Sequence, residues 1–127
     1  MGRIFDSVEV NGISLHTLFD TGSRRSYIAE SAVRGAALEV RTLRASFEVG
    51  LGGERRSLRE YCHVEGRLHS LDINFMAYLV DSLGVDERGN TVNALFGATD
   101  MQLWSIGIDV ERESVDLSHF TRDFIEF

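Results

Sequence analysis

Residues 15–28 read LHTLFDTGSRRSYI, an apolar run that ends in an aspartate, a threonine and a glycine. A strand that looks buried and yet finishes in Asp20 has two explanations. Asp and Gly are common turn residues, so the segment fits an ordinary surface turn. It also fits a catalytic loop, because functional side chains often lie on loops that a rigid scaffold positions. The remaining sequence has to distinguish these two interpretations.

The composition indicates one globular domain. The chain has 127 residues, of which 43% are hydrophobic and 26% are charged, close to the average for globular proteins. This length suffices for one domain with a core and is short for two, so we expect a single domain over residues 1–127. No segment approaches the ~20 apolar residues of a membrane span, and the first ten residues lack the apolar region of a signal peptide. We therefore expect a cytoplasmic protein without a membrane partner.

The charged residues, the cysteine and the histidines exclude several kinds of chemistry. The net charge of −7 opposes binding to nucleic acid. All 13 basic residues are arginine, and the absence of lysine excludes Schiff-base chemistry and a Walker-type phosphate site. Cys62 is the single cysteine and cannot form an internal disulfide. Neither a metal nor another cofactor is expected, because metal-ligand spacing is absent from the four histidines, His16, His63, His69 and His119.

Alternation of apolar and polar residues predicts a mostly β protein. The expected strands cover residues 4–10, 13–19, 58–64, 71–80, 106–110 and 115–117, with another from residue 42 to a glycine-rich tip and a short one before Gly97. Turns are expected at Asn11-Gly12, which is a strong hairpin signal, and at residues 65–67. Residues 29–38 predict a short, weak helix interrupted by Gly35, and a helical turn follows Gly97.

The order of these features resembles the retropepsin-like aspartic proteases. Residues 18–28 match that family's pattern of two apolar residues, Asp-Thr-Gly-Ser, and then a Ser and an aliphatic residue. The second family signature, a hydrophobic pair before a glycine and a short helix, is matched by Leu95-Phe96-Gly97. Met101, Ile106 and residues 108–117 resemble the closing helix and hairpin of the family. The resemblance implies an all-β acid protease barrel with one short helix near its C-terminal part.

The resemblance also implies the chemistry. Such proteases hydrolyse peptide bonds with a water molecule between two carboxylates that share one proton, one acting as base and the other as acid. This chain contains one Asp-Thr-Gly and no second one. The implied enzyme is therefore an obligate C2 homodimer in which each chain supplies its Asp20, and its substrate is a polypeptide.

The residues beside Asp20 receive their roles from the same resemblance. Thr21 is expected to connect the two loops of the dimer, and Gly22 to turn tightly and bring its N–H to the carboxylate. Ser23 is expected to donate a hydroxyl hydrogen bond to Asp20, and Gly97 to support the loop. A mobile flap over the substrate is implied by the glycine-rich tip, Gly50, Leu51, Gly52 and Gly53.

Two departures from the family pattern leave alternatives open. Arg24 and Arg25 follow the Asp-Thr-Gly-Ser segment, where retroviral members often have acidic residues. Together with Arg55, Arg56 and Arg59 they fit either a basic rim that favours acidic substrates or a solvated face with local ion pairs. The flap also lacks the usual aromatic residue or isoleucine at a clear position.

The function has alternatives as well. The chain fits a catalytically silent dimerisation or peptide-binding module with the same fold. It also fits an unrelated small β-barrel in which the segment is only a turn. Phe120, Phe124 and Phe127 near the C-terminus fit either a dimer contact or packing on the chain's own barrel.

Overall fold

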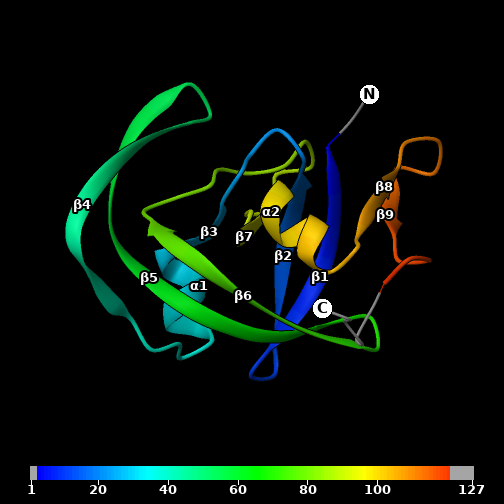
Figure 1. Cartoon of the computed structure of the whole chain (residues 1–127), viewed down its shortest axis with the longest axis horizontal. Coiled ribbons are helices and arrows are strands. Elements are labelled where there is room, and N and C mark those ends of the chain that lie inside the picture. The colour runs from blue at the N-terminus through cyan, green and yellow to red at the C-terminus, as the bar shows by residue number, and fades with distance from the viewer. Residues whose placement is uncertain (1–2, 121–127) are drawn as a thin grey trace, which may run out of the picture.

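Six strands of the computed structural model close into a barrel (Figure 1). The structure describes residues 3–120. Around the barrel the strands follow the order β1, β2, β7, β3, β6 and β5, and β5 pairs back with β1 at Val8 and Leu68. The bounds of these strands are Ile4–Val10 (β1), Ile13–Asp20 (β2), Ser26–Ala29 (β3), Glu54–Leu68 (β5), Leu71–Val80 (β6) and Ala94–Gly97 (β7).

A seventh strand of the main sheet, β4 (Arg41–Leu51), pairs only with β5 and forms the outer arm of a long hairpin. The closing hairpin is a separate two-stranded sheet of β8 (Gly107–Asp109) and β9 (Ser114–Asp116). Most neighbouring strands are antiparallel, but β2 pairs parallel with β7 and β3 pairs parallel with β6. The mixed barrel explains why a continuous apolar run precedes Asp20, because a strand paired in this way is buried on both faces.

The apolar side chains form two clusters on opposite faces of the same strands. Phe19, Ile28 and Phe96 point into the cluster that fills the barrel. Their neighbours Leu18, Tyr27 and Leu95 belong to the second cluster, which the β4–β5 hairpin covers. Since successive residues of a strand point to opposite faces, β2, β7 and β3 contribute to both clusters. These three strands are therefore anchored on both sides where the chain reaches Asp20.

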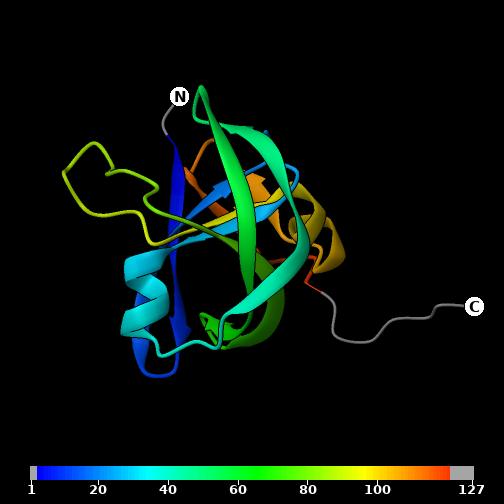
Figure 2. The same ribbon diagram turned by 90° about the vertical axis from the view of Figure 1, so that its left-hand side faces the viewer.

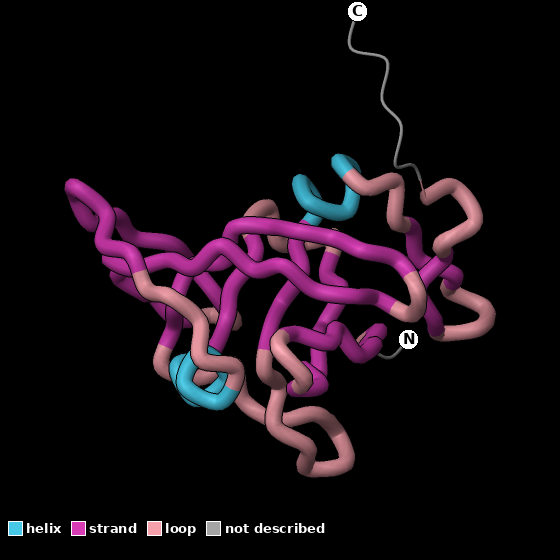
Figure 3. Tube along the Cα trace, turned by 90° about the horizontal axis from the view of Figure 1, so that it is seen from below, coloured by secondary structure: helices cyan, strands magenta, loops and turns pink. Residues whose placement is uncertain are grey.

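Two short helices lie on opposite sides of the strands (Figure 3). The helix α1 (Glu30–Gly35) is shorter than the 29–38 expected and ends at Gly35, after which Ala37 has a φ of +51°. The helix α2 (Ala98–Leu103) follows Gly97 as expected. The alternation and composition of the sequence predicted both helices, whereas the fold class implied by the resemblance included only the one near the C-terminal part, so α1 is a correction to that fold class. In the described residues, neither helix is long and apolar enough to cross a membrane.

The turn expected at residues 65–67 is wrong. The strand β5 continues through these residues to Leu68, and the chain turns at His69, which has a φ of +56°. Gly66 is required by close packing instead, because a Cβ there would lie 2.8 Å from Cγ1 of Val8 and 3.0 Å from the carbonyl oxygen of Glu9. The glycine thus lets β1 cross closely over β5 and close the barrel.

Candidate active site

Asp20 is the last residue of β2, and the register places it directly beside Gly97 at the end of β7. The carboxylate is half-buried, whereas Thr21 and Gly22 are exposed. A cavity of about 370 Å³ opens beside Asp20, and its walls include Leu18 and Ile108. The strand is therefore buried up to Phe19 and presents its final carboxylate at the surface.

The loop after Asp20 orients the carboxylate. The backbone N–H of Gly22 donates a hydrogen bond of 2.8 Å to Oδ1 of Asp20, as expected for this glycine. The backbone N–H of Ser23 approaches the carbonyl oxygen of Asp20 at 3.3 Å. A Cβ at Gly22 would lie only 3.1 Å from Oδ1 of Asp20. Because a side chain at position 22 would crowd the carboxylate of Asp20, this tight turn favours glycine there.

The role expected for the Ser23 hydroxyl is not the one observed. This hydroxyl donates to the carbonyl oxygen of Arg25 at 2.9 Å. A hydroxyl has one proton, so the same group cannot also donate to Asp20. Ser23 instead closes the loop on itself, and within the chain Asp20 receives its side-chain hydrogen bond from the backbone of Gly22.

Gly97 packs directly against the loop that follows Asp20. A Cβ on Gly97 would lie 2.6 Å from the carbonyl carbon of Arg25 and 2.9 Å from the carbonyl oxygen of Ser23. The next two N–H groups hold the same loop, since Ala98 donates to Ser23 at 2.6 Å and Thr99 donates to the carbonyl of Arg24 at 3.2 Å. The supporting position expected for Gly97 therefore has a direct steric basis.

Two residues at this site were not recognised as site residues from the sequence. Ser26 is almost fully buried, and its hydroxyl accepts a hydrogen bond from the N–H of Gly97 at 2.9 Å and donates to Oδ2 of Asp100 at 2.6 Å. Burial raises the pKa of Asp100, and the hydrogen bond from Ser26 opposes that rise. The signal available for Ser26 was its place in the family pattern, and the signal for Asp100 was an acid in the first turn of a helix, which is common.

The β4–β5 hairpin lies across the strands that lead to Asp20 (Figure 2). Its apolar side chains Phe47, Val49 and Leu51 pack on the second cluster. Gly52 and Gly53 form the turn with φ values of +60° and +81°, which glycine adopts readily. Gly50 and Leu51 end β4 rather than belonging to the turn. The hairpin therefore covers the second cluster with the apolar side chains of β4.

The arginines divide into two groups. Arg55 pairs with Glu48 at 3.2 Å, and Arg56 pairs with Asp81 at 2.9 Å, which fits the solvated face with local ion pairs. No ion pair in residues 3–120 includes Arg24, Arg25 or Arg59. Of the five arginines considered for a basic rim, the two that follow the Asp20 loop and lack an ion pair within the described residues are therefore Arg24 and Arg25.

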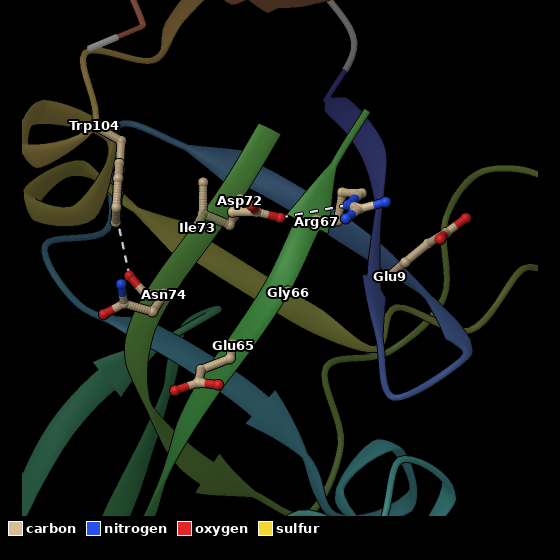
Figure 4. A pocket seen from close by; sticks show the side chains of 8 residues that line it. All are labelled: Glu9, Glu65, Gly66, Arg67, Asp72, Ile73, Asn74 and Trp104. Atoms are coloured by element: carbon tan, nitrogen blue, oxygen red, sulfur yellow. Dashed lines mark hydrogen bonds and ion pairs between the residues drawn. The ribbon is translucent and has the colours of Figure 1, made fainter. Parts of the chain in front are cut away.

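Another hollow, of about 580 Å³, lies on the outside of the barrel (Figure 4). Arg67 pairs with Asp72 there at 3.4 Å, and the indole N–H of Trp104 donates to the carbonyl oxygen of Asn74. The ring of Trp104 also stacks on Phe120, whereas Phe124 and Phe127 lie outside the described residues. None of the loop residues around Asp20 line this hollow. In residues 3–120 no group of three or more His, Cys, Asp or Glu side chains is placed to hold a metal ion.

This chain is similar to known proteins in its three-dimensional structure and not in its sequence. The sequence matches no protein-family model and no curated protein. The retroviral protease-like domain of Ddi1 from Leishmania major superimposes with a TM-score of 0.68 over 94% of this chain and 91% of that domain, at 12% identity. A Legionella pneumophila protein of unknown function (DUF785) has a TM-score of 0.46 over 77% of this chain and 83% of that one, at 10% identity.

The likeness to the Ddi1 domain defines the class of fold. The chain is a mostly β, six-stranded mixed barrel with short helices and has the retropepsin-like fold. The resemblance that the Asp-Thr-Gly segment and Leu95-Phe96-Gly97 indicated is thereby confirmed at the level of the fold.

Proposed function

We propose that this protein is a homodimeric aspartic endopeptidase in which Asp20 of two chains forms the catalytic pair. The observation that carries the proposal is the setting of Asp20. It stands half-buried at the end of β2, beside Gly97, with Oδ1 accepting the N–H of Gly22 at 2.8 Å. The retropepsin-like fold supports this assignment, because it supplies the barrel edge at which such a pair would meet.

The chemistry requires two chains. Residues 1–127 contain one Asp-Thr-Gly, so a pair of carboxylates needs a two-fold axis beside Asp20. The two carboxyl groups share one proton. As a water molecule attacks the peptide carbonyl carbon, the ionised Asp20 takes a proton from that water. The protonated Asp20 donates to the carbonyl oxygen. The proton taken up as the intermediate forms then passes to the leaving amine when the C–N bond breaks.

The neighbouring elements fit the remaining tasks of a protease. Thr21 is exposed and would contact the loop of a second chain, and the β4–β5 hairpin would close over a bound polypeptide. Because the hairpin packs on Leu18, Tyr27 and Leu95, it would have to lift from this floor for a substrate to lie between the two. Closing over the substrate would exclude water from the reacting carboxylates.

Cleavage of a mixed peptide library tests the proposal. We expect the wild-type protein to cut peptides between about pH 3 and 8, a span that covers ordinary and raised carboxylate pKa values. Asp20→Asn keeps an oxygen for the Gly22 N–H but removes the acid and the base, so the rate should fall by at least about 100-fold. Mass spectrometry of both reactions identifies the cut sites.

The result that contradicts the proposal is the absence of cuts at every pH from a wild-type protein that is folded and dimeric. Circular dichroism and gel filtration of both proteins provide that control. Such a result would favour the alternative function, a catalytically silent dimerisation or peptide-binding module. Cuts that persist unchanged in Asp20→Asn would show a contaminating protease.

A further inference from the structure

Arg25 is the one arginine that bridges the floor and the flap. It lies five residues after Asp20, immediately before β3, and its side chain is exposed. Its guanidinium carbon sits 5.1 Å above the ring of Phe47, which belongs to the β4 arm of the flap. On the floor, its positive charge and hydrogen bonding oppose the rise that burial causes in the pKa of Tyr27.

The backbone holds Arg25 in a fixed place. Its carbonyl oxygen accepts the hydroxyl of Ser23 at 2.9 Å and packs directly against Gly97. The rings below it are also ordered, because Phe47 meets Tyr78 edge to face at 5.4 Å and Tyr27 lies 6.4 Å from Tyr78. The guanidinium therefore caps a packed aromatic group rather than extending freely into solvent.

The charge of Arg25 is not neutralised within the described part of the chain. None of the ion pairs there includes it, although Arg55 and Arg56, on the other arm of the hairpin, both have acidic partners. The guanidinium of Arg25, five residues after Asp20, thus carries a positive charge without a carboxylate partner in residues 3–120, in a chain with a net charge of −7. Five N–H donors of an arginine match the two oxygens of a carboxylate.

We propose that Arg25 makes this site select polypeptides with an acidic side chain near the scissile bond. This inference rests on the proposed function and specifies its substrate class. A substrate between the flap and the floor passes the guanidinium, which can leave Phe47 in part and bind a Glu or Asp carboxylate. The two-fold axis places one Arg25 on each side of the bond, so acidic residues are favoured on both sides.

Two labelled peptides test the preference without requiring cleavage. Both are fluorescein-labelled decapeptides with the same apolar centre. One has Glu and the other Gln at two positions that flank the central bond. Fluorescence anisotropy measures their binding to the Asp20→Asn protein, which keeps the site but not the chemistry. We expect the Glu peptide to bind about tenfold more tightly than the Gln peptide. This is the usual effect of one additional charge-assisted hydrogen bond, here between Arg25 and the Glu carboxylate.

Substitutions of Arg25 assign the preference. Arg25→Gln should reduce the ratio of the two affinities to about 1, and Arg25→Glu should favour a peptide with Lys at the same positions. Arg25→Lys keeps the charge and should retain part of the preference, which a merely structural role of Arg25 would not predict. Arg34→Gln removes the same charge from α1, and because Arg34 lines neither of the cavities beside Asp20, the ratio should stay unchanged.

The outcomes separate this inference from the proposed function. Equal binding of the two peptides, or a preference that survives Arg25→Gln, overturns the inference even if the wild type cuts both peptides. A preference that depends on Arg25 while the wild type cuts neither peptide supports the inference and contradicts the peptidase proposal. If neither peptide binds nor is cut, both are overturned.

Discussion

At the scale of single residues, Gly97 is where the structure leaves least freedom. The peptide groups of residues 23–25 lie directly on it, and a side chain would have to displace backbone rather than the end of a flexible side chain. The hydroxyl of Ser26 accepts the Gly97 N–H from below. Asp20 therefore depends on a contact made 77 positions later in the chain, across the parallel β2–β7 pair.

A methyl group at this position should be costly. We expect Gly97→Ala to lower the free energy of unfolding by about 1–3 kcal/mol, the usual cost of overpacking a buried site. Urea unfolding followed by circular dichroism measures this. Gly35→Ala is the matched control, because a Cβ there meets nothing within 4 Å, and it should be neutral or stabilising by up to about 1 kcal/mol. Equal effects of the two substitutions would contradict the role of Gly97.

At the scale of elements, the carboxylate of Asp86 is one group that holds the long loop between β6 and β7 in place. The loop projects from the barrel at the side of α1 (Figure 2). Asp86 accepts the N–H groups of Arg88 and Asn90 at 2.8 and 2.9 Å, and its Oδ2 lies 2.9 Å from Nε2 of His16 on β2. Burial raises the pKa of Asp86, but these hydrogen bonds outweigh it and lower the pKa from 3.8 to about 2.

This shift predicts a pH dependence for the loop. A carboxyl group with a lower pKa in the folded state binds fewer protons there than in the unfolded chain, so its contribution to stability is present above pH 3.8. It is lost as the pH falls from about 4 to about 2. We expect wild type to exceed Asp86→Asn in stability at pH 6, with a difference that shrinks over this interval.

Urea unfolding at a series of pH values from about 2 to 6 measures the difference. Asp72→Asn, at the other end of the barrel, serves as the control for removing one negative charge. A difference between wild type and Asp86→Asn that stays constant across the interval would show that the hydrogen bonds do not hold the ionised carboxylate.

At the scale of the whole molecule, the proposed enzyme exists only as a pair. One chain presents an exposed loop with Asp20, Thr21 and Gly22 at its surface. A cavity of about 800 Å³, the wall of which includes Thr21, Ile106 and Ile108, opens beside this loop. A second copy brought here would meet both the loop and an apolar hollow, which is a suitable surface for association.

We expect the protein to sediment as a dimer of twice the 14.2 kDa of one chain, with activity that falls on dilution below the dissociation constant. Thr21→Ala removes a hydroxyl from each side of the two-fold axis and should weaken the dimer about tenfold or more, at roughly 1 kcal/mol for each lost hydrogen bond. Thr91→Ala changes an exposed threonine on the β6–β7 loop and should not alter the dimer. A monomer at concentrations where peptides are cut would contradict the two-chain dyad.

The sequence by itself determined the features that depend on neighbours along the chain. Alternating side chains predicted residues 4–10 and 71–80 as strands with the bounds observed, and the Asn11-Gly12 turn and the helix after Gly97 were also correct. The position of Asp20 at the end of an apolar strand followed from the same local pattern. Such features are legible because backbone geometry and solvent act on each segment separately.

Only the tertiary structure decided the features that depend on distant segments. Position 66 in β5 requires a glycine because β1 packs closely against it, and the Ser23 hydroxyl donates to the carbonyl oxygen of Arg25 rather than to Asp20. The bond from Ser26 to Asp100 spans 74 positions. The stacking of Arg25 on Phe47 likewise joins the loop before β3 to β4, the outer arm of the long hairpin. The local pattern of apolar and polar residues cannot predict these contacts. They contribute free energy only when the closed barrel brings the partners together.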